Sequence, residues 1–196
     1  MKKVNKILIK SLLCWLIFFV QAESKIISIG NTEAKVKIKV FSSLTCPHCA
    51  HFHEKIYKNL KEEFIDTGKV RFEHHAFPLD LAALNAEKIL RCIKNSEKSF
   101  QFLSEIYKKQ NKWAVGSDIN KINESLKKIS LNFNLDSAKI DSCLKDENTQ
   151  DKILNERIQA QKKYKITSTP TIFINEKKYE GKHDYKKFKK MVIKNL

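Results

Sequence analysis

The chain has 196 residues, a length that suits one domain or one domain carrying an insertion. Its formal net charge is +16, but lysine is spread along the whole chain without an arginine cluster, so we interpret the charge as a solvated basic surface and expect no nucleic-acid partner. Only four glycines and three prolines occur, which indicates long elements with few breaks.

The first segment differs from the rest of the chain. Four lysines within residues 2–10 precede an uncharged, mostly apolar run at 11–20, and residues 20–22 (VQA) resemble a small-residue cleavage site. This layout predicts a secretory signal peptide at 1–22 and a periplasmic location; an uncleaved membrane anchor is the alternative. Cleavage lowers the net charge to +12 and leaves four cysteines, an even number that favours disulfides in an exported protein: Cys46, Cys49, Cys92 and Cys143.

Hydrophobic periodicity predicts the elements of the first third. Apolar residues recur every three or four positions from Cys49 to Phe64, which predicts a helix with Cys49 on its buried face, ended by Gly68. The flanking segments alternate as strands do, and the short connections predict that the two strands beside the helix are parallel. The predicted elements are strands at 25–29 and 36–41, a helix at 46–66 and a strand at 70–75.

The middle of the chain carries no strand signal and is predicted to be helical. Strands return near the end, followed by a helix with Phe188, Met191 and Val192 turned inward. We therefore predict an α/β sheet domain, residues 23–78 and 165–196, interrupted by an all-helical insertion at 79–164. After residue 78, the predicted elements are helices at 81–95, 96–110, from 117, at 137–145 and 150–164, strands at 171–175 and 178–180, and a helix at 184–195.

Residues 45–53, TCPHCAHFH, place two cysteines three positions apart at the start of the first helix. A c-type haem site needs histidine directly after the second cysteine, and Ala50 stands there. Zinc is an alternative through the cysteines with His51 and His53, but a structural zinc site usually draws a second ligand pair from a distant segment. We expect neither a metal nor another cofactor.

A redox pair fits the same residues better. At a helix N-terminus, free amide groups and the helix dipole stabilise a thiolate at Cys46, and Pro47 fits a first turn that needs no amide donor. His48 can donate a hydrogen bond or carry positive charge. Cys49 lies one turn further on the apolar face, so we expect it to be buried, less acidic and the resolving sulfur.

The acidity of Cys46 sets the direction of exchange. A pKa of roughly 5, instead of about 8.5, raises the reduction potential by roughly 60 mV at neutral pH, which makes the disulfide a better oxidant. Pro170, just before the strand at 171–175, offers a second signal. Such a proline often has a cis peptide bond, and without an amide proton it can pack against a disulfide; an ordinary turn is the alternative.

Together, the leader, CPHC, FPLD at 77–80 and TSTPTIFIN at 167–175 resemble the DsbA-like thiol:disulfide oxidoreductases of the thioredoxin superfamily, especially alpha-proteobacterial members. The resemblance covers nearly all of residues 25–196. It implies a thioredoxin fold with an inserted helical domain, and a catalytic Cys46–Cys49 pair beside a cis Pro170 that follows Thr169. Threonine at this position also occurs in isomerase and reductase relatives.

One position departs from the family pattern. The family commonly has a buried glutamate six positions before the first cysteine, and this chain has Val40 there. Lys39 is no substitute because adjacent strand residues face opposite sides. The acid that commonly takes the proton of the second cysteine is therefore missing at this position, which affects the proton path at Cys49 but not attack by Cys46.

The remaining cysteines, Cys92 and Cys143, lie on predicted helices of the insertion. A second disulfide in some alpha-proteobacterial relatives favours a structural bridge between them, and two buried free thiols are the alternative. We expect His74, His75 and Trp113 to serve packing or surface roles and not chemistry.

The resemblance implies an exported oxidoreductase that oxidises cysteine pairs in newly exported proteins, and we expect it to be a monomer. A DsbB-like membrane protein would reoxidise it. Substrates would lie as extended segments near Cys46 and Pro170. The alternatives are an isomerase or reductase kept reduced, and a metal-binding chaperone that uses the cysteine–histidine cluster.

Overall fold

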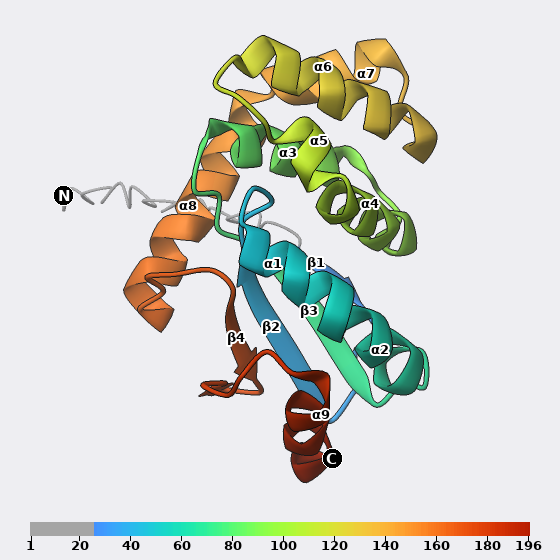
Figure 1. Cartoon of the computed structure of the whole chain (residues 1–196), viewed down its shortest axis with the longest axis vertical. Helices are drawn as coiled ribbons and strands as arrows, with labels where there is room; N and C mark the ends of the chain where they lie inside the picture. The colour runs from blue at the N-terminus through green and yellow to red at the C-terminus, as the bar shows by residue number, and fades with distance from the viewer. Residues whose placement is uncertain (1–25) are drawn as a thin grey trace, which may run out of the picture.

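The computed structural model describes residues 26–196, so the predicted leader lies outside the described part of the chain (Figure 1). Five strands form one sheet in the order β1-β3-β2-β4-β5. The central strands β2 and β3 are parallel, as predicted, and the other pairs are antiparallel. The strands are β1 (Ile27–Ile29), β2 (Val36–Ser42), β3 (Val70–Ala76), β4 (Thr171–Ile174) and β5 (Lys177–Lys178).

A continuous helical rod connects β2 to β3, where one helix was predicted at 46–66. Two stretches of it are wider, π-helical turns, and apolar side chains at helical spacing bury one side of the rod against the sheet. Gly68 ends the rod at a φ of +74°, a left-handed conformation that glycine adopts without strain. The rod comprises α1 (Pro47–Phe52), η1 (His53–Tyr57), α2 (Lys58–Leu60) and η2 (Lys61–Ile65).

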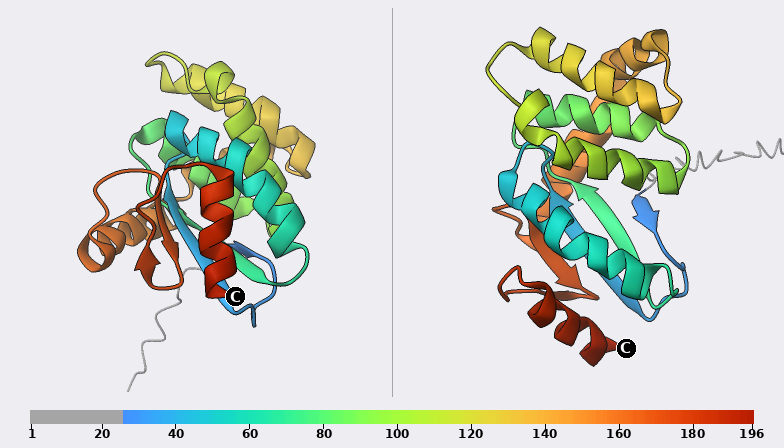
Figure 2. Two further views of the ribbon diagram at one scale, coloured as in Figure 1. Left: turned by 60° about the horizontal axis from the view of Figure 1, so that its bottom comes forward. Right: turned by 45° about the vertical axis from the view of Figure 1, so that its right-hand side comes forward.

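Between β3 and β4 the described chain is helical, with no strand. Helices α3 to α7 stack beyond one end of the sheet, and α8 runs back alongside it (Figures 1 and 2). This arrangement confirms the thioredoxin fold with an inserted helical domain. The helices are α3 (Leu81–Cys92), α4 (Ser96–Lys108), α5 (Gln110–Trp113), α6 (Ile119–Ser130), η3 (Leu131–Phe133), α7 (Ser137–Lys145) and α8 (Glu147–Tyr164).

Aspartate or asparagine side chains fix the starts of most of these helices. Each accepts a hydrogen bond from a free amide of the first turn, which stabilises a helix by about 1 kcal/mol. Asn95 caps α4 and so ends α3 at Cys92, three residues earlier than predicted. The other caps in the insertion are Asp80, Asp118, Asp136 and Asp146.

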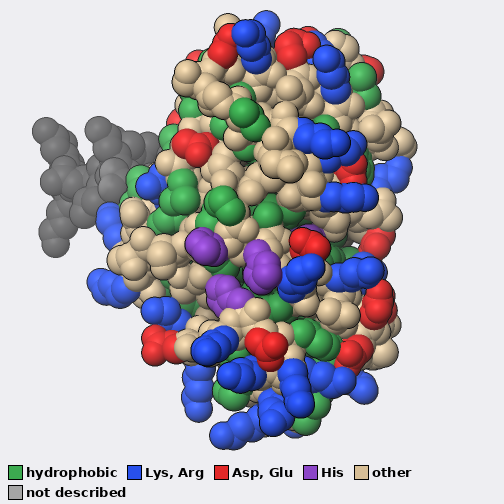
Figure 3. Space-filling view, in the orientation of Figure 1, with side chains coloured by type: hydrophobic (Ala, Val, Ile, Leu, Met, Phe, Trp, Pro, Cys, Tyr) green, Lys and Arg blue, Asp and Glu red, His purple; other side chains and the backbone are tan. Residues whose placement is uncertain are grey.

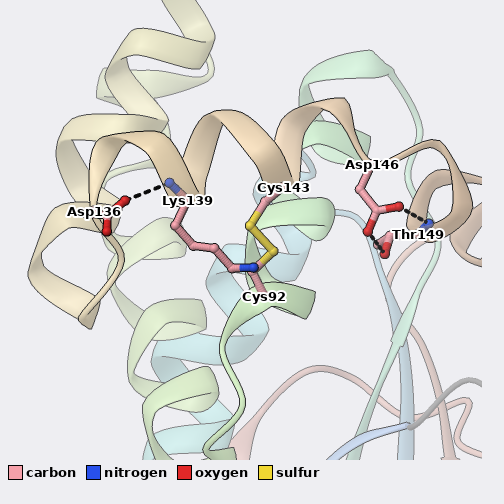
Figure 4. Close-up of a disulfide and its surroundings, with 6 residues drawn as sticks. All are labelled: Cys92, Asp136, Lys139, Cys143, Asp146 and Thr149. Carbon is pink, nitrogen blue, oxygen red and sulfur yellow. Dashed lines mark hydrogen bonds between the residues drawn. A yellow bond between two sulfur atoms is a disulfide. The ribbon is translucent and has the colours of Figure 1, made fainter.

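A disulfide joins Cys92, at the end of α3, to Cys143 in α7, with their Cα atoms 6.3 Å apart (Figure 4). The structure thus contains the second bridge that the resemblance implied. Figure 4 also shows Asp136 and Asp146, which accept hydrogen bonds from the amides of Lys139 and Thr149 on either side of the bridge. The bridge joins α7 to α3, and the two caps fix the starts of α7 and α8.

The two faces of the sheet pack different partners. Val40 and its same-face neighbours pack against the helical rod and the insertion, whereas Phe41 packs on the opposite face with Phe173 and residues of α8. Lys39 also lies on that opposite face, where its Nζ donates to Glu176 Oε1 at 2.8 Å. The expectation that Lys39 points away from the side of Val40 is therefore confirmed.

The last helix, α9 (Tyr185–Asn195), packs its buried Phe188 against Phe52 of the rod, with ring centroids 5.8 Å apart. Val192, one turn later, is also buried. Met191 is 40% exposed, so the prediction that it points inward is wrong. Phe188 and Val192 lie four residues apart on one stripe, and Met191 falls at the edge of that stripe. Within residues 26–196, no helix has both the length and the apolar character that crossing a membrane requires.

Candidate active site

Cys46 occupies the N-cap of α1, with φ −79° and ψ 118°. Its carbonyl accepts hydrogen bonds from the amides of Cys49 at 3.1 Å and Ala50 at 3.2 Å, so it closes the first helical turn. Pro47 follows as the first helical residue, where no amide donor is needed. Cys46 is 7% exposed and Cys49 is 2% exposed, and both are free thiols in this structure.

Pro170 reaches the same place from the other end of the chain. The Thr169–Pro170 peptide bond is cis, and the Cys46 Sγ lies 3.3 Å from the Thr169 carbonyl oxygen, to which it donates a hydrogen bond in its thiol form. The contact follows from strand pairing, because Thr171 lies opposite Phe41 in the antiparallel β2–β4 ladder. The structure therefore brings Cys46, Cys49, Thr169 and Pro170 together.

The two sulfurs differ sharply in acidity. A hydrogen bond from the Cys49 side chain and, against partial burial, hydrogen bonds from the amides of Cys49 and His48 lower the pKa of Cys46 to about 5. Burial, together with the neighbouring Cys46 sulfur, raises the pKa of Cys49 far above its usual range. At neutral pH the pair therefore carries one thiolate, on Cys46, and one thiol, on Cys49.

The histidines of the motif have different surroundings. His48 and His51 are exposed and lie close to His183, whose pKa is lowered by burial and by these two neighbours. Figure 3 shows histidine side chains gathered on this face of the molecule. His53 is buried, its Nε2 is 2.8 Å from Ser104 Oγ, and burial lowers its pKa to about 3. Among residues 26–196, no group of three or more His, Cys, Asp and Glu side chains is arranged to hold a metal ion.

Two contacts from the insertion hold the active-site loop, and sequence reasoning missed both. Gln110 of α5 donates from Nε2 to the carbonyl oxygens of Leu44 at 2.8 Å and Cys46 at 3.2 Å. Thr45 donates to Asp80, the cap of α3, at 2.7 Å. Neither contact has a local sequence signal, because the partners are far apart in the chain.

We expect Gln110→Ala to lower the free energy of unfolding of the reduced protein by about 1–2 kcal/mol, because two partly buried hydrogen bonds are lost. Urea unfolding followed by circular dichroism measures this. Gln101→Ala, which removes an exposed glutamine from neighbouring α4, is the matched control and should change stability little. Equal effects of the two substitutions would show that Gln110 does not hold the loop.

This geometry equips the site for thiol–disulfide exchange. An acidic sulfur at a helix start can attack or leave as a thiolate, and a second sulfur one turn away can close a disulfide with it. A cis proline beside the pair presents a backbone edge without a competing amide. A thioredoxin-type sheet that carries such a cysteine pair is characteristic of proteins that carry out thiol–disulfide exchange.

Comparison with known proteins agrees with this class. The thioredoxin family model matches residues 22–194, so the chain belongs to the thioredoxin family. The crystal structure of alpha-DsbA1 from Wolbachia pipientis superposes with a TM-score of 0.80 at 29% identity, covering 87% of this chain and 90% of that one. BdbD from Bacillus subtilis superposes with a TM-score of 0.76 at 20% identity, covering 86% of this chain and 91% of that one, which shows the shared fold.

Curated relatives carry related names. A putative protein-disulfide oxidoreductase of Rickettsia bellii is 30% identical over 75% of this chain and 56% of its own length. A probable disulfide bond formation protein D of Bacillus cereus is 30% identical over 86% of this chain and 78% of its own length. The chain thus spans about half the length of the Rickettsia relatives that it matches. The predicted resemblance to DsbA-like oxidoreductases is confirmed.

Proposed function

We propose that this protein is an exported thiol:disulfide oxidoreductase that donates its Cys46–Cys49 disulfide to cysteine pairs of newly exported proteins. The observation that carries the proposal is the contrast between an acidic Cys46 and a buried, weakly acidic Cys49 beside a cis Pro170. A low pKa stabilises the reduced form, and so makes the disulfide oxidising.

Donation proceeds in two exchanges. A substrate thiolate attacks Cys46 Sγ, the Cys46–Cys49 bond breaks, and Cys49 leaves with the bonding electrons and takes up a proton. A second substrate thiolate then attacks the substrate sulfur of the mixed disulfide, and Cys46 leaves as a stable thiolate. The substrate is oxidised to a disulfide, and the protein is left as a dithiol.

Exposed apolar side chains beside the loop offer contacts for an extended substrate. Leu79 and Leu81 are 49% and 54% exposed. The Leu79 amide donates to Ser43 Oγ at 3.3 Å, which places Leu79 directly against the active-site loop. We assign Thr169 and Pro170 to the backbone contact with substrate, and Pro47 and His48 to the environment of the attacking sulfur.

Export to the periplasm and reoxidation by a DsbB-like membrane protein complete the proposal. Both rest on the predicted leader and on the similarity to DsbA-like proteins. We further propose that the protein acts as a monomer. Trapping a mixed disulfide from intact cells with a Cys49→Ser variant, which cannot resolve it, identifies the substrates and the reoxidant by mass spectrometry.

Equilibration of the mature protein with glutathione tests the direction of exchange. We expect a reduction potential above about −180 mV, the range of strong protein oxidants. The Cys46→Ser variant, which cannot form the pair, is the control and should show no redox transition. A potential below about −250 mV, near that of thioredoxin, would remove the oxidase proposal.

An isomerase or reductase is the second candidate, and Thr169 before the cis proline is the observation that favours it. Such a protein works with its cysteines reduced. Alkylation of thiols in intact cells, followed by gel separation, distinguishes the two: an oxidase is found mostly as the disulfide, and an isomerase or reductase mostly as the dithiol.

A further inference from the structure

A buried histidine–glutamate pair lies beside the redox pair, on the face of the sheet that carries Val40. His74 of β3 lies directly opposite Val40 of β2 in the parallel ladder, so both side chains point to the same face. His74 Nε2 is 2.7 Å from Glu87 Oε1 of α3, and the two side chains are 3% and 0% exposed. The chain therefore holds a buried carboxylate here, although Val40 supplies none.

A small cavity of about 10 Å³ lies between His74 of this pair and Cys49. Cys49, His74 and Tyr107 line it together with Val40, and a space of this size between polar groups can hold one water molecule. Ser42 and His53 add further polar groups to the wall. A water in this cavity would contact both Cys49 and His74, because both line it.

Two buried polar atoms near this cavity lack partners within the described structure: one on Tyr107, which lines the cavity, and one on Glu87, whose other carboxyl oxygen contacts His74. The Tyr107 hydroxyl and Glu87 Oε2 are both buried and make no hydrogen bond to protein atoms. Buried polar atoms in native proteins are almost always hydrogen-bonded, to protein or to water. Neither atom is explained by packing, since leucine or phenylalanine would fill these places without that cost.

Cys49 has to gain and lose a proton in every cycle, and its surroundings hinder this. Its sulfur is almost inaccessible to solvent, and burial disfavours a free thiolate there. The Cys46 Sγ is the atom that the Cys49 sulfur attacks, so it does not serve as the proton acceptor. A proton acceptor for Cys49 therefore has to lie inside the protein.

We infer that the His74–Glu87 pair exchanges the proton of Cys49 through a water molecule in this cavity. When a mixed disulfide is resolved, Cys49 Sγ passes its proton to the pair and its electrons to a new bond with Cys46 Sγ. The bond from Cys46 to the outside sulfur breaks, and that sulfur leaves with the bonding electrons. In the reverse reaction, Cys49 leaves with the electrons of the disulfide and recovers the proton.

The test follows the reactions of the two sulfurs separately. It uses an aromatic disulfide reagent that releases a coloured thiolate. With the reduced protein, attack by Cys46 releases the first equivalent and resolution by Cys49 releases the second. We expect Glu87→Gln, which keeps a hydrogen-bonding group beside His74, to slow the second release at least tenfold and to leave the first unchanged. Opening of the Cys46–Cys49 disulfide by glutathione should slow by the same factor. The reduction potential should then stay the same, because it depends on the ratio of the two rates.

Glu73→Gln is the matched control, because Glu73 is a buried glutamate one residue from His74 on the opposite face, where it contacts Arg71 and His75. It should leave both phases unchanged. Should Glu87→Gln fail to fold, His74→Gln replaces it, since that side chain keeps a donor toward Glu87 but carries no proton between groups.

A carboxyl group placed on β2, at the position of Val40, should rescue the Glu87→Gln variant. Val40 lines the same cavity, so Val40→Glu in the Glu87→Gln background should recover most of the second release. An unchanged second phase in Glu87→Gln, or an equal loss in Glu73→Gln, would overturn the inference. A low potential in the glutathione measurement would overturn the proposed direction of exchange but leave this result standing, because proton exchange is needed in both directions.

Discussion

Alkylation of the reduced protein by iodoacetamide at a series of pH values should show Cys46 reacting with a midpoint near pH 5. The thiolate is the reactive form, so the rate rises as pH rises through the pKa and is already on its plateau at pH 7. Cys49 should stay unreactive throughout, because burial raises its pKa. Mass spectrometry of the alkylated peptides assigns the modification, and Cys46→Ser should abolish it.

Two substitutions of Cys49 test the cause of the lowered Cys46 pKa. The Cys49 side chain is the largest cause of the lowered Cys46 pKa, through its hydrogen bond. Cys49→Ser keeps a donor and should leave the midpoint near pH 5, whereas Cys49→Ala removes the donor and should raise it. A midpoint near 8.5 in the wild-type protein, the value of an ordinary cysteine, would contradict the assignment of Cys46 as the attacking sulfur.

The lowered pKa of Cys46 also makes the stability of the reduced protein depend on pH. A folded-state pKa below the unfolded value stabilises the folded dithiol form at pH values above the unfolded pKa. That contribution is lost as pH falls through about 5, when the Cys46 thiolate becomes protonated. The disulfide form lacks this group, so its stability has no such component.

Local periodicity predicted the elements around the site because each element is encoded by its own side chains. The apolar spacing through Cys49, Phe52 and Ile56 is a property of one helix, and the alternation in β2 and β3 is a property of each strand. Helix ends were less predictable. The helix predicted at 81–95 ends at Cys92, because Asn95 caps the next helix and a helix cannot continue through a residue that caps its successor.

The long-range contacts of the site could not be read from local patterns. Gln110 and Asp80 reach the active-site loop from the insertion, and nothing in their immediate neighbours indicates this. His74 was expected to have a packing or surface role, because its partner Glu87 lies on a helix whose pattern indicates only burial. The meeting of Cys46 with Pro170 was predicted from the family resemblance. It depends on the pairing of strands that are far apart in the chain, and no local pattern reveals that pairing.

Removing the disulfide of the insertion should cost about 4 kcal/mol of unfolding free energy, because a loop of roughly 50 residues is no longer closed in the unfolded chain. Cys92 and Cys143 are 51 residues apart in sequence, and the loop between them contains α4, α5 and α6. Urea unfolding of the Cys92→Ala/Cys143→Ala double variant measures the loss, with the Cys46–Cys49 pair kept reduced in both proteins so that only one bridge differs.

The double variant is preferred because a single substitution leaves a free thiol in a protein that exchanges disulfides. Replacing the two sulfurs together removes the cross-link without creating a new nucleophile. The Cys46 alkylation midpoint should stay near pH 5 in this variant, since none of the groups that set it belongs to the bridge. A loss below about 1 kcal/mol would mean that packing of α3 against α7 holds the insertion without the bridge, and a shifted midpoint would mean that the bridge also shapes the redox site.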